Sequence, residues 1–165
     1  MDREDFVRHF GGIYEHSAWV AEQAFDHADN DLSDIDSLTR ALRTEVNAAS
    51  HTQQLALLRA HPDLAGKAAL QGELTDASTN EQAGAGLDQC STEELSRFKD
   101  FNESYLSRFE FPFIMAVKGA NRYLILEAFE KRLKNNREVE FKTALEEVHK
   151  IAGFRLVAWF EEEGS

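Results

Sequence analysis

The stretch from residue 138 to residue 161 reads EVEFKTALEEVHKIAGFRLVAWFE, and its periodicity decides the fold class. Side chains that are apolar except for one arginine recur there at spacings of three and four residues, at Phe141, Leu145, Val148, Ala152, Arg155 and Trp159. This spacing places them on one face of an α-helix. The same helical spacing continues through the rest of the chain, so the sequence predicts an all-α protein.

Punctuation along the chain agrees with this class. Only two prolines and nine glycines are present among 165 residues, which is little for a fold of many strands. Ser50 with Gln53 and Ser91 with Glu94 form capping-box patterns that begin helices. We expect a single compact domain over residues 1–165 with about seven to nine helices of unequal length. The expected helices include residues 3–10, 14–27, 34–49, 53–60, 91–109, 121–134 and 138–161.

Composition excludes several classes of protein. The formal net charge of −12 argues against binding to nucleic acid or to an anionic membrane surface, because both need a basic patch. No apolar run is long enough to span a bilayer, and the acidic N-terminus lacks a signal-peptide core. The single cysteine, Cys90, excludes an internal disulfide and a thiolate zinc site, and we interpret it as incidental rather than as a nucleophile. We therefore expect a cytoplasmic protein.

His61 is the first candidate for chemistry. It lies between a helical segment and Pro62, whose ring has no N–H and disfavours helical angles at the residue before it. The helix should therefore end near His61 and leave the imidazole at a junction with a loop. An imidazole titrates near neutral pH and is suited to proton transfer. The alternative interpretation is that His61 simply ends a helix.

The second candidate is the cluster from residue 78 to residue 87, STNEQAGAGL. Glu81 could form an acid–base pair with His61. The alternative is structural, because Ser78 and Glu81 match the Ser-x-x-Glu capping box. Gly84 and Gly86 should end that helix early, and small residues let a backbone approach a ligand closely.

Arg155 is the third candidate, because it places a charge on the apolar face of the last helix. A guanidinium at a cleft wall suits a carboxylate or an imide carbonyl. In the alternative interpretation, its stem packs and its head reaches a surface glutamate. Motifs for a phosphate loop, a dinucleotide site or a metal site are absent from the sequence. The sequence therefore indicates acid–base chemistry with no metal, no cofactor and no covalent intermediate.

Four segments together carry a resemblance to a known family: HPDLAGKAAL (61–70), LTDASTNEQAGAGL (74–87), FNESYLSRFEFPFIMAVKG (101–119) and IAGFRL (151–156). They resemble the 2-oxo-4-hydroxy-4-carboxy-5-ureidoimidazoline (OHCU) decarboxylase family of urate catabolism. The resemblance implies an all-helical, cofactor-independent enzyme, commonly a homodimer. It implies that a small ureidoimidazoline loses CO2 to give (S)-allantoin, after urate oxidase and hydroxyisourate hydrolase have acted.

The resemblance also implies roles for individual residues. His61 and Glu81 match the catalytic pair. The other matched positions bind substrate or line the pocket: Pro62, Ser78, Gln82, Phe111, Phe113, Ile114 and Arg155. Two positions depart from the family pattern, since Glu110 stands where glycine is usual and Gly153 where a basic residue is frequent.

Two alternative functions stay open at this point. One is a lyase or hydrolase that acts on a related ureido compound. The other is a non-catalytic helical interaction module in which His61 and the Ser78-x-x-Glu81 pattern are helix ends.

Overall fold

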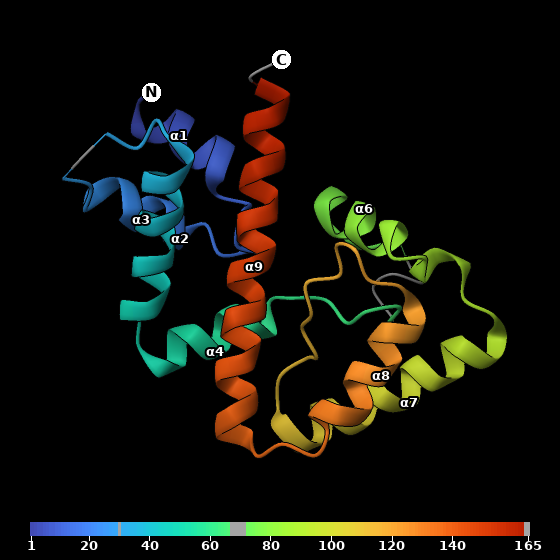
Figure 1. Ribbon diagram of the computed structural model, residues 1–165. Helices are drawn as coiled ribbons and strands as arrows, with labels where there is room; N and C mark the ends of the chain where they lie inside the picture. The colour runs from blue at the N-terminus through green and yellow to red at the C-terminus, as the bar shows by residue number, and fades with distance from the viewer. Residues whose placement is uncertain (30, 67–71, 164–165) are drawn as a thin grey trace. The chain divides into compact units, whose positions relative to one another are not determined.

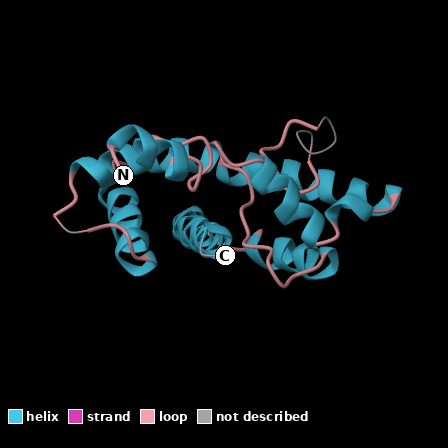
Figure 2. Ribbon diagram, turned by 90° about the horizontal axis from the view of Figure 1, so that it is seen from above, coloured by secondary structure: helices cyan, strands magenta, loops and turns pink. Residues whose placement is uncertain are grey.

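A computed structural model describes residues 1–29, 31–66 and 72–163. Over these residues the chain forms eight α-helices and one short 3₁₀ helix, and no strand (Figures 1 and 2). The all-α class and the expected number of helices are therefore confirmed. Their bounds are α1 (Arg3–Phe10), α2 (Trp19–Asp26), α3 (Ile35–Ala48), α4 (His51–Arg59), α6 (Asp76–Gly84), η1 (Leu87–Gln89), α7 (Thr92–Phe109), α8 (Arg122–Arg132) and α9 (Arg137–Glu163).

Capping residues set most of these bounds. Ser50 with Gln53 and Ser91 with Glu94 form complete capping boxes at the starts of α4 and α7, as predicted. Helix α2 begins at Trp19, later than the expected residue 14, because the preceding chain turns and His16 has a left-handed φ of 50°. None of the helices in the described ranges is long and apolar enough to cross a membrane.

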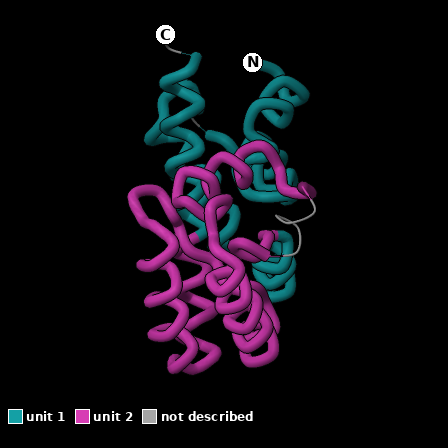
Figure 3. The backbone as a smooth tube through the Cα atoms, turned by 90° about the vertical axis from the view of Figure 1, so that its right-hand side faces the viewer, with its two compact units in different colours: residues 1–60, 148–165 teal, residues 61–147 magenta. Residues whose placement is uncertain are grey.

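The chain divides into two compact units, shown in teal and magenta in Figure 3. Unit 1 comprises residues 1–60 and 148–165, and unit 2 comprises residues 61–147. Helix α9 contributes its first part to unit 2 and its remainder to unit 1. The expectation of one domain over residues 1–165 stays a prediction.

The core of unit 1 is built from the apolar faces of its helices. Leu38, Leu42 and Val46 follow one another at a spacing of four on α3, and all three are buried. The Phe10 ring of α1 packs against Trp159 of α9 with ring centroids 4.7 Å apart. The helical periodicity of the sequence therefore identifies the buried face correctly here.

The core of unit 2 is mainly aromatic. Phe113 stacks on Phe129 at 3.8 Å between ring centroids, and Tyr105 meets Phe113 edge to face at 5.2 Å. Offset and edge-to-face pairs are the favourable arrangements of aromatic rings. The segment after α7 is thereby packed between α7 and α8, and it carries three of the predicted pocket residues.

Glu110, one of the two departures from the family pattern, has a left-handed backbone. It is the C-cap of α7 with φ 65° and ψ 21°, and its carboxylate pairs with Arg137 at 2.7 Å on the surface. Left-handed angles cost a residue with a Cβ about 1–2 kcal/mol relative to glycine. We expect Glu110→Gly to be more stable than Glu110→Ala by about 1 kcal/mol in urea unfolding. Both variants lose the ion pair, so equal stabilities would contradict strain at this residue.

Gly153, the other departure, lies inside α9, which continues through it without a break. A Cβ built there meets no atom within 4 Å. We expect Gly153→Ala to raise the free energy of unfolding by about 0.5–1 kcal/mol, because alanine loses less backbone entropy in a helix. At Gly11 the added Cβ would lie 2.5 Å from the Val7 carbonyl oxygen. Gly11→Ala should therefore destabilise, and thermal unfolding of both variants measures the contrast.

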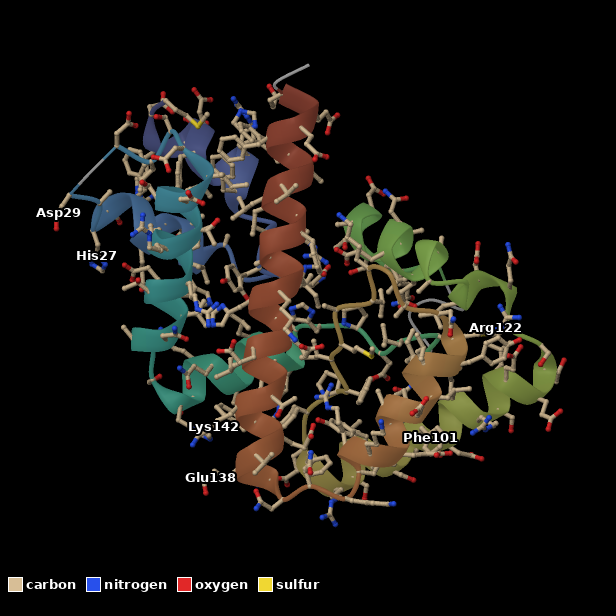
Figure 4. All side chains as sticks on the ribbon, viewed as in Figure 1. His27, Asp29, Phe101, Arg122, Glu138 and Lys142 are labelled. Carbon is tan, nitrogen blue, oxygen red and sulfur yellow. The ribbon has the colours of Figure 1, made fainter. Side chains whose placement is uncertain are left out.

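His27 couples the stability of unit 1 to pH. It is the C-cap of α2, labelled in Figure 4, and its Nδ1 lies 2.9 Å from Glu45 Oε1. The hydrogen bond to Glu45 and its charge raise the pKa of His27 above 6.5. The contribution of this contact to stability is therefore fully present below the unfolded pKa and is lost as the pH rises through the folded pKa. Urea unfolding is measured at pH values of about 5.5 and 8.5. Between these values the free energy of unfolding should fall more for the wild type than for Glu45→Gln. Equal decreases in the two proteins would contradict the coupling.

Candidate active site

The predicted histidine lies in a short loop of unit 2. Helix α4 ends at Arg59 with Ala60 as its C-cap, so the predicted helix end near His61 is confirmed. The His61 side chain is buried, and residue 61 is 8% exposed. After Pro62 the chain turns, and Ala65 adopts a left-handed φ of 51°. Lys67 to Leu70, the end of the HPDLAGKAAL motif, lie outside the described residues.

Gln82, a residue of α6, binds the backbone of this loop. Its Oε1 accepts a hydrogen bond from the Ala65 N–H at 3.0 Å, and its Nε2 donates to the Asp63 carbonyl at 3.2 Å. Both ends of the side-chain amide therefore bind the loop backbone. This contact brings the chain around His61 next to α6, the helix that carries Glu81. The binding of substrate by Gln82 stays a prediction.

Asn102 of α7 adds a second anchor. Its Nδ2 donates to the Leu64 carbonyl at 3.0 Å, so residues 63, 64 and 65 are each held by a side-chain amide. Asn102 is a polar residue on the same helix face as Phe98, Tyr105 and Phe109, and its hydrogen bond to Leu64 gives it a structural role. Its Oδ1 is buried and has no hydrogen-bond partner in the part of the chain that the structure describes. A buried acceptor without a partner is costly and is uncommon in native structures.

Ser78 and Glu81 do not form a capping box. The N-cap of α6 is Thr75, whose side chain accepts from the Ser78 N–H at 3.2 Å. Ser78 is therefore inside the helix, and the capping interpretation of Ser78-x-x-Glu81 is wrong. Residues 78, 81 and 82 share one face of α6, because spacings of three and four are neighbours on a helix. Ser78 and Gln82 are buried and Glu81 is half-buried.

The end of α6 agrees with the sequence. The helix stops at Gly84, and Gly86 with φ 78° is the N-cap of η1, so the glycines end α6 early as predicted. Cys90 follows η1, and burial together with Glu94 raises the pKa of its thiol. A thiol with a raised pKa is a poorer nucleophile at neutral pH. This supports the interpretation of Cys90 as incidental.

One carboxylate of the loop is perturbed. Burial raises the pKa of Asp63 above its ordinary value of 3.8. Asp63 was not among the predicted site residues, although it belongs to the motif that carries His61. No group of three or more histidine, cysteine, aspartate or glutamate side chains within the described ranges could hold a metal ion.

The predicted pocket wall lies in the aromatic core of unit 2. The side chains of Phe111, Phe113 and Ile114 are all buried, at no more than 3% exposed. The Ile114 carbonyl accepts a hydrogen bond from Arg132 Nη1 at 2.6 Å, and the Ala116 N–H donates to Glu147 at 3.2 Å. Because the side chains are packed into the core, the main chain is the part of this segment that can meet a ligand.

Arg155 belongs to unit 1. Its Nη2 lies 2.8 Å from Glu15 Oε2, and its Nη1 donates to the carbonyls of Gly12 and Ile13 at 3.3 Å each. The side chains of Arg155 and Glu15 are 8% and 1% exposed. The alternative in which Arg155 reaches a surface glutamate is therefore wrong, because its partner is buried. Its substrate-binding role stays a prediction.

Three charged residues that no pattern in the sequence singles out are functional candidates. Glu15, Arg132 and Glu140 are charged residues with buried partners, and Glu140 is fully buried. Glu15 is 140 positions from Arg155 along the chain, and no spacing connects them. Near its start, α9 buries Glu140 and Ala144 rather than the expected Phe141 and Leu145, so no apolar pattern pointed to Glu140.

A buried histidine at a helix end, held beside a helix with a glutamate, can support acid–base chemistry. A sequence model of the OHCU decarboxylase family matches residues 1–157. The 2-oxo-4-hydroxy-4-carboxy-5-ureidoimidazoline decarboxylase of Haloferax volcanii is 47% identical over 163 residues, covering 99% of this chain and 94% of that protein. This chain belongs to the OHCU decarboxylase family and is thus a carboxy-lyase.

Solved structures agree with this assignment. A crystal structure of (S)-allantoin synthase is similar with a TM-score of 0.75 and 38% identity, covering 96% of this chain and 51% of that chain. This protein therefore spans about half the length of that solved chain. A crystal structure of OHCU decarboxylase in the presence of (S)-allantoin has a TM-score of 0.75 at 22% identity, covering 98% of this chain and 99% of that chain, and supports the fold.

Proposed function

We propose that this protein decarboxylates 2-oxo-4-hydroxy-4-carboxy-5-ureidoimidazoline to (S)-allantoin, in the degradation of urate and without a cofactor. The relationship to the Haloferax volcanii decarboxylase over nearly the full length of both chains supports the reaction. The observation in the structure that carries the proposal is the double contact of Gln82 with Asp63 and Ala65. It holds the His61 loop beside the helix of Glu81.

The predicted site residues of unit 2 then have the following roles in the reaction. Breaking the bond between the ring and its carboxyl group releases CO2 and leaves an electron pair on the ring. Backbone N–H groups near Phe113 and Ile114 stabilise the negative charge that develops on carbonyl oxygens, as in an oxyanion hole. His61 exchanges a proton with the substrate hydroxyl, and Glu81 orients it or completes the transfer. A proton delivered from one face gives a single enantiomer.

The other predicted residues bind the substrate in this proposal. Ser78 and Gln82 offer polar groups on α6, and Pro62 shapes the loop that follows His61. Arg155 holds a polar edge of the substrate, a role that rests on the resemblance of IAGFRL to the family motif. We also propose that residues 1–165 act as one domain, that the protein is cytoplasmic and that it forms a homodimer.

A coupled assay from urate tests the reaction. Urate oxidase and hydroxyisourate hydrolase generate the labile ureidoimidazoline in the cuvette, and circular dichroism follows the handedness of the allantoin that forms. We expect (S)-allantoin to appear at a rate proportional to the concentration of this protein.

The uncatalysed reaction provides the control, since the ureidoimidazoline decays slowly to racemic allantoin without enzyme. Racemic product at that background rate, with this protein present and folded, would remove the proposed reaction. A panel of related ureido compounds would then test the alternative lyase or hydrolase activity.

A further inference from the structure

A buried ion pair outside the predicted site contacts its pocket wall. Arg132 is the last residue of α8, Glu140 lies in the first turn of α9, and both belong to unit 2. Their side chains are 12% and 0% exposed, and a guanidinium nitrogen lies 2.9 Å from Glu140 Oε2. Burying two charges is costly, and a well-packed apolar pair is often at least as stable. Stability alone therefore gives no reason for this pair.

The Arg132 guanidinium also holds the backbone of the pocket wall. Its Nη1 donates to the Ile114 carbonyl at 2.6 Å, and its central carbon lies 4.4 Å from the centroid of the Phe113 ring. A planar guanidinium can make both contacts at once, because its edge donates hydrogen bonds while its face stacks on a ring. Two consecutive residues of the segment are thus fixed by one side chain.

Glu140 keeps that guanidinium in place. Its carboxylate accepts hydrogen bonds from Arg132 Nε at 2.9 Å, from Asn135 Nδ2 at 2.8 Å and from the Tyr105 hydroxyl. Burial raises the pKa of Tyr105 far above its ordinary value, so the hydroxyl stays protonated and remains a donor. Arg132 therefore has a fixed partner on one edge and the Ile114 carbonyl on the other.

We propose that Arg132 and Glu140 are positioning residues, which orient the backbone of Phe113 and Ile114 for the substrate. The inference rests on the proposed function, in which backbone N–H groups near these two residues stabilise developing charge. A peptide unit is planar and trans, so holding the Ile114 carbonyl also fixes the direction of the Met115 N–H, which belongs to the same peptide unit. The bond from the Ala116 N–H to Glu147 fixes the next turn of the chain. Donors of this kind act only when they are already aligned with the oxygen they stabilise.

The test compares Arg132 with Arg122, a matched arginine on the same helix. Arg122, labelled in Figure 4, donates to Glu94 Oε2 at 2.8 Å and lies 4.9 Å from the Tyr123 ring, so it has the same kinds of contact without one to residues 111–114. We expect Arg132→Lys to lower kcat for (S)-allantoin by about 100-fold with a smaller change in KM, since misplacement by about 1 Å has an effect of this size. Arg122→Lys should leave kcat unchanged.

Two further variants separate positioning from folding. Arg132→Met should lose more activity than Arg132→Lys, which keeps the charge, when rates are expressed per folded protein from far-ultraviolet circular dichroism. Tyr105→Phe removes only the hydroxyl that donates to Glu140, and it should also lower kcat. This variant keeps the positioning role testable if the Arg132 variants do not fold.

The outcomes distinguish this inference from the function on which it rests. A wild type that makes (S)-allantoin, with Arg132→Lys and Tyr105→Phe as fast as Arg122→Lys, would overturn the positioning role and leave the reaction standing. A wild type without activity would overturn the proposed function, and the positioning role with it.

Discussion

Replacing His61 by alanine should lower kcat for (S)-allantoin formation by about 10²–10⁴-fold, the usual contribution of a general acid or base. The reason is local, since His61 is the imidazole that the loop anchored by Gln82 and Asn102 holds beside α6. The product that still forms should be closer to racemic, because no fixed donor then delivers the proton from one face. Stopped-flow circular dichroism in the coupled assay measures the rate and the enantiomeric excess together.

The control for this variant is His51, the exposed first residue of α4. His51→Ala removes an imidazole from the other end of the same helix and should change neither the rate nor the enantiomeric excess. A His61→Ala protein with the full rate and full excess would show that the imidazole is not catalytic. The same result would favour the alternative in which His61 only ends a helix.

Replacing Glu81 tests whether it acts together with His61. If Glu81 and His61 act as one unit, each single replacement removes the function of the pair. Glu81→Gln keeps the shape of the side chain and loses its charge, so it should lower kcat while the helix remains. The double variant should then be hardly slower than the slower single variant. Multiplicative losses would mean that the two residues act in separate steps.

Local chemistry explains what the sequence predicted well. Ser50 and Ser91 begin helices because each can accept from a backbone N–H three residues later, and this needs only neighbouring residues. Pro62 ends α4 for an equally local reason. The same argument failed at Ser78, because Thr75 three residues earlier takes the N-cap position. Thr75 and Ser78 are both suitable N-cap residues when only neighbouring residues are considered. In the structure Thr75 is the N-cap and Ser78 is buried inside the helix.

Long-range pairing explains what the sequence could not predict. The partner of Arg155 is Glu15, and the partners of Arg132 include the Ile114 carbonyl, so each contact depends on how distant segments pack. The positive φ of Glu110 shows an intermediate case. The glycine usual at that position in the family indicates a left-handed residue, although Glu110 itself carries no such signal.

The largest expected effect on stability comes from the buried pair of Glu15 and Arg155. Removing one partner of a buried ion pair leaves a desolvated charge and costs about 3–5 kcal/mol. We therefore expect Glu15→Ala to lower the free energy of unfolding by about this amount, measured by urea titration. Arg155→Ala should have a similar effect, with an added loss of the hydrogen bonds to the Gly12 and Ile13 carbonyls.

The double variant distinguishes coupling from two independent losses. If the pair is coupled, Glu15→Ala with Arg155→Ala should lose less stability than the sum of the single variants, because neither charge is then left buried alone. The exposed pair of Arg3 and Asp26, also in unit 1 with atoms 2.8 Å apart, provides the matched control. Asp26→Ala should change the unfolding free energy far less, since solvent screens that pair. If the losses of unfolding free energy at Glu15 and Arg155 are additive, the two buried charges are stabilised by separate surroundings. Glu15 would then have no part in holding the Arg155 guanidinium.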